Sequence, residues 1–297
     1  MSYLSLSKGF LAVSAVLVAA SLTLLVYPGP RLSIEFTGGT LMELELPEGK
    51  TRDDLAMALR EPAASSLPLE SAIISRTKTG TYFLRTETLT RQQHGELMTA
   101  LTSKLGELKE LQYTTIGPSV GKSLKRQAIV ALGIASLGII VYLAFAFRKI
   151  KGRLSPWTLG IAAILAVIHD LSLVVGIFTI LSYHTSFQLD TLFIAAMLST
   201  MGYSMSDTIV IFDRIRDNLQ ENRHEALAPL VARSLKQTLT RTLNTGLGAM
   251  IMLFMLFIFG SESIRWFMLA LILGTIIGTY SSFFIAPPLL IFWQRRR

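Results

Sequence analysis

The sequence predicts an α-helical polytopic membrane protein with six transmembrane helices and one α/β domain between the first and second helix. Of the 297 residues, 51% are hydrophobic and only 16% are charged, whereas charged residues make up about a quarter of a typical soluble domain. Many of the charges fall in the stretch Arg31–Arg126. Six other runs each approach the ~20 apolar residues that a bilayer-spanning helix needs. We therefore expect one polar domain inserted among membrane helices.

The six expected spans share a long apolar run with few charges. They are Gly9–Tyr27, Ala128–Phe147, Pro156–Leu181, Leu189–Phe212, Leu243–Phe259 and Trp266–Trp293. The first could be read as a signal peptide, but Tyr27-Pro28-Gly29-Pro30 offers no small-residue cleavage site, so we expect it to be retained. The last contains Pro287-Pro288, which predicts a kink near its end. The predicted boundaries are 1–27 for the first helix, 28–122 for the α/β domain and 123–297 for helices two to six.

Basic residues in the short loops predict the orientation of the chain, because Lys and Arg are enriched on the cytoplasmic side. With six spans, all of these residues fall on one side: Lys8, Arg148, Lys149, Lys151, Arg153, Arg214, Arg216, Arg223, Arg233, Lys236 and Arg295–Arg297. The opposite short loops, Ser182–Gln188 and Gly260–Ser263, contain no Lys or Arg. We expect cytoplasmic N- and C-termini and a periplasmic α/β domain. The net charge of +8 therefore indicates membrane orientation rather than nucleic-acid binding.

The α/β domain is predicted to be ferredoxin-like. Alternating apolar and polar residues predict strands at Leu32–Phe36, Leu41–Leu46 and Leu111–Ile116, and a hairpin at Ala72–Arg85 around Lys78-Thr79-Gly80. Helix-start signals predict one helix from Thr51 and a second from Thr90 to Leu105. The order βαββαβ is that of a small ferredoxin-like sandwich. Its strand edges could bind a partner or an extended chain, and a spacer without binding function is an equal alternative.

The segment Gly117–Ser123 resembles a phosphate-binding P-loop but has three residues between its glycines, where that motif has four. It also precedes a transmembrane helix on the outer side. We therefore predict no nucleotide site, and interpret Gly117 and Gly121 as a hinge. The sequence has no cysteine, which excludes disulfides and thiolate metal sites. No metal cluster or nucleophile–base pattern predicts an enzyme.

Ionisable residues inside membrane spans are functional candidates, because an uncompensated charge there costs about 2.5–3.5 kcal/mol. One polar stripe with helical spacing lies in the fourth span, at Thr200, Tyr203, Ser204 and Asp207. A second begins at Arg241, which opens the fifth span on the cytoplasmic side, and continues at Asn244, Thr245 and Gly248. The two spans run antiparallel, so we expect Asp207 and Arg241 to meet as an ion pair that protonation of Asp207 would open. The alternative is a static pair that fixes helix packing.

Asp170 lies near the middle of the third span, beside His169. Both could serve a proton path, and Asp170 could equally cap a broken helix or bond a neighbouring backbone group. Asp213 and Asp217 lie among arginines, which favours a solvated helix end. Gly274 and Gly278, with Ser282, have the spacing of small residues at a helix–helix contact.

Several segments, in order along nearly the whole chain, resemble the SecF family. They are Phe36–Thr40, Gly117–Gly121, His169-Asp170, Gly202–Arg216, Ser234–Thr242 and Gly278–Ser282. The departures are small: Ser206 stands where the family usually has Asn, and Gly260-Ser261-Glu262 where a Gly-Gly pair is common.

The resemblance implies half of an RND-superfamily transporter in the bacterial cytoplasmic (inner) membrane. Its implied partners are SecD, the SecYEG channel and the exported preprotein, with YajC and YidC as further candidates. The implied energy source is the proton-motive force, without a cofactor, and Na⁺ is an open alternative to H⁺. By the same resemblance, Asp207 and Arg241 take part in proton coupling, with Thr245 and Asp170 as further candidates. The alternatives are a translocon assembly factor without catalytic function and an RND-type exporter of small molecules or lipids.

Overall fold

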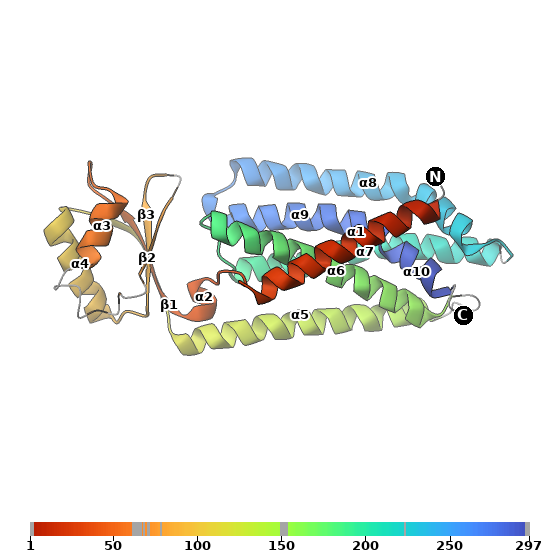
Figure 1. Ribbon diagram of the computed structural model, residues 1–297, viewed down its shortest axis with the longest axis horizontal. Coiled ribbons are helices and arrows are strands. Elements are labelled where there is room, and N and C mark those ends of the chain that lie inside the picture. The colour runs from red at the N-terminus through yellow and green to blue at the C-terminus, as the bar shows by residue number, and fades with distance from the viewer. Residues whose placement is uncertain are drawn as a thin grey trace. The chain divides into compact units, whose positions relative to one another are not determined.

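The computed structural model describes residues 3–60, 67, 69, 72–77, 79–148, 154–222 and 224–294. The chain divides into two compact units (Figure 1). One is helical and contains Met1–Pro30, Val130–Leu181 and Leu192–Arg297; the other is the α/β unit, Arg31–Ile129 with Ser182–Thr191. The predicted boundaries had assigned Ser182–Thr191 and the residues after 122 to the membrane helices.

Within the described residues, six stretches of helix are long and apolar enough to cross a membrane, as predicted. The helices that provide them are α1 (Tyr3–Val26), α5 (Pro118–Ala146), α6 (Pro156–His184), α7 (Thr191–Glu221), α8 (Leu227–Phe259), and α9 (Glu262–Phe284) with α10 (Ala286–Gln294). The basic residues 149, 151, 153, 223 and 295–297, on which the orientation partly depends, lie outside the described residues.

Several helices are longer than their apolar runs. α5 begins at Pro118 instead of Ala128, and α8 begins at Leu227 instead of Leu243. Polar and charged residues are frequent in these additional turns, so a search for long apolar runs detects only part of each helix. The predicted kink is confirmed, because α9 ends at Phe284 and α10 starts just before Pro287-Pro288. Proline cannot donate the backbone hydrogen bond that a continuous helix requires.

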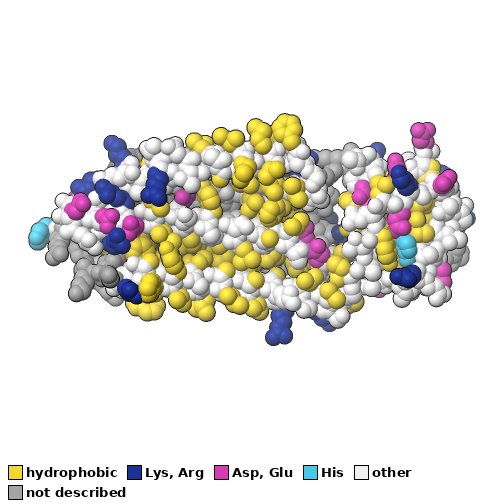
Figure 2. Space-filling view, turned by 180° about the vertical axis from the view of Figure 1, so that it is seen from behind, with side chains coloured by type: hydrophobic (Ala, Val, Ile, Leu, Met, Phe, Trp, Pro, Cys, Tyr) yellow, Lys and Arg dark blue, Asp and Glu magenta, His cyan; other side chains and the backbone are white. Residues whose placement is uncertain are grey.

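The buried core of the helical unit is formed mainly by α6, α7 and the α9–α10 region. Small side chains of α6, including Ala162, Ala163 and Ala166, belong to the same buried cluster as larger ones such as Phe212 and Ile215 of α7. The apolar side chains of α1, α5 and α8 are largely exposed within this chain, and Figure 2 shows hydrophobic side chains spread over the surface of the helical unit. Such continuous apolar surface is suited to lipid or to a second membrane protein.

The α/β unit contains a four-stranded antiparallel sheet in the order β2-β3-β1-β4. The strands are β1 (Gly39–Glu45), β2 (Ile73–Arg76), β3 (Tyr82–Thr86) and β4 (Lys109–Ile116), and the longer helices are α3 (Arg52–Leu59) and α4 (Arg91–Leu105). Met42, Leu44 and Leu84 of the sheet form the core with Leu97 and Leu101 of α4. The chain order β1-α3-β2-β3-α4-β4 confirms the predicted βαββαβ arrangement.

Both long helices of this unit begin where their capping residues predict. Thr51 accepts a hydrogen bond from the Asp54 amide, and the Asp54 carboxylate accepts one from the Thr51 amide. Thr90 and Gln93 form the same reciprocal arrangement at the start of α4. Each capping box satisfies amides that have no partner inside the helix. The β2–β3 hairpin also forms as predicted, although Lys78 in its turn lies outside the described residues.

The predicted strand Leu32–Phe36 is wrong, because residues Ile34–Thr37 form the short helix α2. Ser33 starts this helix by accepting a hydrogen bond from the Glu35 amide at 3.2 Å. The chain then turns sharply at Gly38 and Gly39, whose φ angles are +77° and +131°. A Cβ atom at Gly39 would lie 2.7 Å from the Thr86 carbonyl oxygen, so only glycine fits this entry into β1.

Candidate functional site

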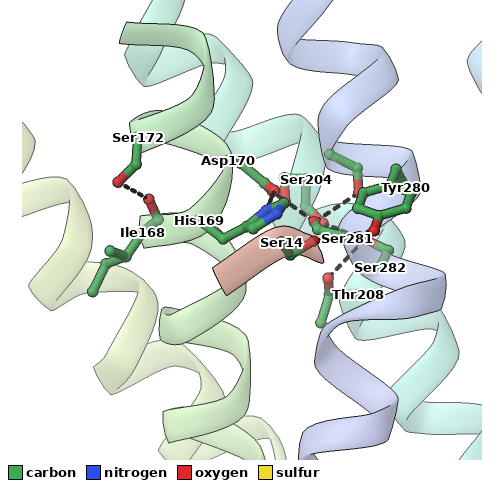
Figure 3. A network of polar contacts seen from close by, with 11 residues as sticks. Ser14, Ile168, His169, Asp170, Ser172, Ser204, Thr208, Tyr280, Ser281 and Ser282 are labelled. Atoms are coloured by element: carbon green, nitrogen blue, oxygen red, sulfur yellow. Dashed lines mark hydrogen bonds and ion pairs between the residues drawn. The ribbon is translucent and has the colours of Figure 1, made fainter. Parts of the chain in front are cut away.

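Asp170 is the centre of a polar network inside the helical unit (Figure 3). Its side chain is 1% exposed. Oδ2 accepts hydrogen bonds from Ser204 Oγ of α7 at 2.5 Å and from Ser281 Oγ of α9 at 2.8 Å. Oδ1 lies 2.8 Å from His169 Nδ1. One carboxylate therefore joins α6, α7 and α9. α6 is unbroken from Pro156 to His184, so Asp170 does not cap a broken helix.

This arrangement makes the hydrogen bonds of Asp170 sensitive to protonation, which those of a hydroxyl or amide group would not be. As a carboxylate it is an acceptor only, which suits three surrounding groups that can each donate. A proton added to it makes one oxygen a donor. At least one of the contacts to His169, Ser204 and Ser281 must then break or reverse. Protonation also removes the charge that strengthens the two serine bonds, and these bonds join Asp170 to α7 and α9.

The network continues from His169 toward α1. The imidazole is 5% exposed, and its Nε2 is buried without a hydrogen-bond partner. Its ring centroid lies 6.0 Å from that of Tyr280 on α9. Tyr280 Oη is in turn 3.0 Å from Ser14 Oγ on α1. The His169 ring therefore packs near Tyr280, whose hydroxyl group contacts α1, and no hydrogen bond joins the imidazole to either hydroxyl group.

Small residues of α9 allow α7 to approach closely enough for these bonds. Cβ atoms added to Gly274 and Gly278 would clash with Thr200 and with Ser204 of α7, in the latter case at 2.9 Å from Cβ. One turn further along, Ser282 Oγ is 2.8 Å from Thr208 Oγ1. The predicted small-residue contact is thus confirmed. Its consequence is that hydroxyl groups of two helices meet inside an apolar bundle.

Asp207 lies on the same face of α7, three residues after Ser204. Its side chain is 5% exposed, and Thr279 Oγ1 of α9 donates to Oδ2 at 3.5 Å. Two residues further along α9, Ser281 donates to Asp170. Each carboxylate therefore accepts a hydrogen bond from a hydroxyl group of α9, an arrangement that the sequence analysis did not predict. The hydroxyl residues within an otherwise apolar last span were the available signal.

Arg241 does not reach Asp207 within this chain. Both residues are described, and no ion pair joins them within 4.0 Å. α8 buries Thr242 and Gly246, whereas Arg241 and Thr245 are exposed, and Thr245 Oγ1 donates to the Arg241 carbonyl oxygen at 3.0 Å. The helix contact that we expected to form the pair is made by Gly246, whose added Cβ would lie 3.0 Å from Tyr203 Oη.

The two glycines interpreted as a hinge lie in the α/β unit. Gly117 connects β4 to α5, whereas Gly121 lies inside the first turns of α5. A Cβ atom at Gly121 would be 2.9 Å from the amide nitrogen of Gly38. Gly121 therefore permits close backbone packing, and movement about the Gly117 connection stays a prediction.

The remaining charged candidates have simpler roles. Arg216 Nη2 lies 2.7 Å from Asp213 and 3.1 Å from Asp217, and all three side chains are partly exposed. This is the solvated helix end that the sequence predicted. The described residues contain no group of three or more His, Cys, Asp or Glu that could hold a metal ion.

Comparisons with known proteins show which family this chain belongs to. The family model "Protein export membrane protein SecD/SecF, C-terminal" matches residues 96–296, and the model of the SecD/SecF GG motif matches residues 24–46. The chain belongs to the SecD/SecF family. The GG-motif match includes Gly38-Gly39, and the C-terminal match includes Asp170, Asp207 and Arg241.

Curated relatives assign this SecD/SecF family member to its SecF branch. The chain is 38% identical to "Protein translocase subunit SecF" of Thermobaculum terrenum, with 95% of this chain and 90% of the relative covered. It is 32% identical to the SecF subunit of Anaerolinea thermophila, with 96% and 91% covered. It is 34% identical to "Protein translocase subunit SecDF" of Thermus thermophilus. That match covers 96% of this chain and 37% of the longer relative.

Solved structures of the family agree. The crystal structure of SecDF from Thermus thermophilus, described as a translocon-associated membrane protein, matches all of this chain and 39% of its own length. Its TM-score is 0.86 at 32% identity. A second SecDF structure, in a super-membrane-facing form, gives 0.71 at 31% identity. Together with the six apolar helices, these relatives identify this family member as a multi-pass protein of the bacterial inner membrane.

Proposed function

We propose that this chain is the SecF subunit of a SecDF complex, which uses the proton-motive force to promote translocation of exported proteins across the cytoplasmic membrane. Relatives of similar length carry the name protein translocase subunit SecF. The observation that carries the coupling part of the proposal is the hydrogen-bonded Asp170 carboxylate, buried where α6, α7 and α9 meet. In this proposal the chain is a transport component and not an enzyme, and the proton gradient takes the place of a cofactor.

In the proposed mechanism, Asp170 and Asp207 alternate between carboxylate and protonated forms. A membrane potential supplies ~2.3 kcal/mol per elementary charge per 100 mV, which is enough to bias such a step. In the proposal, protonating Asp170 removes the charge that strengthens its bonds to Ser204 and Ser281, and protonating Asp207 does the same to its bond to Thr279. Because these hydroxyls belong to α7 and α9, the consequence is a different packing of these two helices.

Arg241 and Thr245 act in the proposal from the surface of this chain. Arg241 lies just before the apolar part of α8 and is exposed in this chain, so we infer that a membrane partner covers it and supplies a counter-charge. SecD is the proposed partner, and the exposed apolar faces of α5 and α8 are suited to it. The assembled complex would act at the SecYEG channel on the emerging preprotein, with YajC and YidC as further partners. The Lys and Arg residues of the short loops support an orientation with both termini in the cytoplasm.

The test is translocation of a reporter preprotein into inverted membrane vesicles that contain this chain, the matching SecD and the channel. Each vesicle preparation is measured with the proton gradient intact and after an uncoupler has been added. Asp207→Asn is expected to lose the gradient-dependent part of translocation and to keep the part that remains in the presence of the uncoupler. Asp213→Asn is the matched control, because Asp213 lies on the same helix and is ion-paired at the surface; it is expected to behave as wild type.

A second candidate function, that of a non-catalytic assembly factor, is favoured by one observation. Asp170 is fully engaged with His169, Ser204 and Ser281, and such a network can also serve only to fix helix packing. If Asp207→Asn and Asp170→Asn both retained full gradient-dependent translocation, the coupling role would be refuted and the assembly role preferred.

A further inference from the structure

The segment Arg31–Gly38 follows α1 and is bonded to the loop between α6 and α7. Leu32 and Leu189 form an isolated parallel β-bridge. The Ser33 amide donates to the Leu189 carbonyl at 2.9 Å, and the Leu189 amide donates to the Arg31 carbonyl at 2.8 Å. These groups all belong to the α/β unit. Two connections that are more than 150 residues apart in sequence are therefore joined by backbone hydrogen bonds.

Glu35 adds a side-chain contact to this junction. Its Oε2 accepts hydrogen bonds from the Thr191 amide at 2.7 Å and from Thr191 Oγ1 at 2.6 Å. Thr191 is the first residue of α7. A helix leaves its first amides without partners, and its amino end favours negative charge. The Glu35 carboxylate thus satisfies an amide at the start of α7 through a charge-assisted bond, although Glu35 is distant in sequence.

The same segment contacts the start of α5 on another side. A Cβ atom at Gly121 would lie 2.9 Å from the Gly38 amide nitrogen and 3.2 Å from the Phe36 carbonyl carbon. A Cβ atom at Gly38 would lie 2.9 Å from Pro118 Cα. Backbone therefore packs directly on backbone, which leaves little room for independent movement of these parts. The first residues of α5 and of α7 are both held by Arg31–Gly38.

We propose that Glu35 is a positioning residue that holds the start of α7, so that movement of this helix is transmitted to the α/β unit. α7 is continuous from Thr191 to Glu221 and carries Ser204 and Asp207. Asp207 follows Thr191 by 16 residues, or about 24 Å along the axis at 1.5 Å per residue. No break interrupts the helix between the two residues. The inference rests on the proposed function, since it assigns a mechanical output to the same coupling helix.

The experiment uses the vesicle assay described above and the absence of natural cysteines. Five variants are compared with wild type in complex with SecD. Three are Glu35→Ala, Asp207→Asn and the exposed control Glu48→Ala. The other two carry Leu32→Cys and Leu189→Cys, one with Glu35 intact and one, the triple variant, with Glu35→Ala. Neighbouring positions on paired strands lie about 4.8 Å apart, within the Cα range of a disulfide. Oxidation of the triple variant therefore replaces the Glu35 contact by a covalent bond beside it. The cross-linking yield of the cysteine pair, with and without Glu35, measures the contact independently of translocation.

We expect Glu35→Ala to lower gradient-dependent translocation by about threefold or more, because a charge-assisted bond at a helix end is lost. We expect normal amounts of the complex with SecD and an unchanged rate of translocation in the presence of the uncoupler. Glu48→Ala should match wild type. Oxidation of the triple variant should restore the gradient-dependent part, and addition of a reductant should abolish it again. A group that acts by proton transfer would not be rescued in this way.

Three results would overturn the inference. The first is normal gradient-dependent translocation by Glu35→Ala while Asp207→Asn is defective, which would leave the proposed function intact. The second is a defect of Glu35→Ala that the oxidised cysteine pair does not rescue. The third is an unchanged cross-linking yield when Glu35 is removed. If instead Asp207→Asn retains the full gradient response, the proposed function fails, and the role of Glu35 in coupling fails with it.

Discussion

Replacing Gly278 by alanine is expected to separate α9 from α7 at the polar network. The new Cβ would lie 2.9 Å from Ser204 Cβ and 3.3 Å from Ser204 Cα, whereas ordinary contacts of this kind are 3.4–4 Å. Neither atom is the flexible end of a side chain, so the two helices must move apart by roughly 0.5–1 Å. Such overpacking typically costs about 1–3 kcal/mol.

Part of this cost is offset, because alanine is preferred over glycine within a helix by up to about 1 kcal/mol. We therefore expect a net loss of about 1–2 kcal/mol in the free energy of unfolding. The same displacement would lengthen the 3.3 Å contact between Ser282 Oγ and the Ser204 carbonyl beyond hydrogen-bonding distance. The gradient-dependent part of translocation should fall with it, since Ser204 also donates to Asp170.

The matched control is Gly202→Ala on α7. Gly202 is exposed, and its added Cβ would meet nothing within 4 Å, so we expect no loss of stability. Both variants are purified in lipid nanodiscs, and unfolding in denaturant is followed by tryptophan fluorescence. Translocation is measured in parallel. Equal stability and equal gradient-dependent translocation for the two variants would refute the close packing of α7 and α9 as the cause of the site geometry.

Two further predictions concern individual carboxylates. Asp170→Asn keeps an acceptor oxygen for the serine hydroxyls and should fold nearly as wild type but lose gradient-dependent translocation, whereas Asp170→Ala should also lose about 3 kcal/mol or more of stability in the nanodisc unfolding assay. Equal stability of the two variants would contradict the hydrogen-bond assignment. In the α/β unit, the Thr51 amide and hydroxyl donate to the Asp54 carboxylate and hold its pKa below the usual value. Its stabilising effect on α3 should therefore be complete above about pH 4 and be lost as the pH falls through the lowered pKa. A ¹³C titration of the Asp54 carboxyl in the full chain checks this, and a midpoint at or above the ordinary value would contradict it.

The sequence by itself determined the elements of this protein and the identity of its polar membrane residues. Apolar runs located all six spans, and reciprocal capping pairs such as Thr51 with Asp54 located the helix starts of the α/β unit. These features depend on near neighbours in the chain, so their physical cause is visible in a short window. The βαββαβ order followed for the same reason.

Local patterns were not sufficient where a segment's conformation depends on a distant partner. Leu32–Phe36 alternates like a strand, but Leu32 pairs with Leu189 and the next residues form α2. Glu35 gave no signal in the sequence, since its partner Thr191 is 156 residues away. Gly121 suggested a flexible hinge in the sequence, but in the structure it allows close packing on the backbone of Gly38.

Only the tertiary structure decided which polar residues meet inside the helical unit. Helical spacing correctly placed Asp207 and Ser204 on one face of α7 and Arg241 and Thr245 on one face of α8. Membrane helices are apolar on nearly all sides, so the hydrophobic pattern does not show which face turns toward which neighbour. The rotation of α8 leaves Arg241 exposed, whereas the glycines of α9 bring Ser281 to Asp170 and Thr279 to Asp207. Close packing between helices, which depends on atoms far apart in the chain, therefore determined the arrangement of the site.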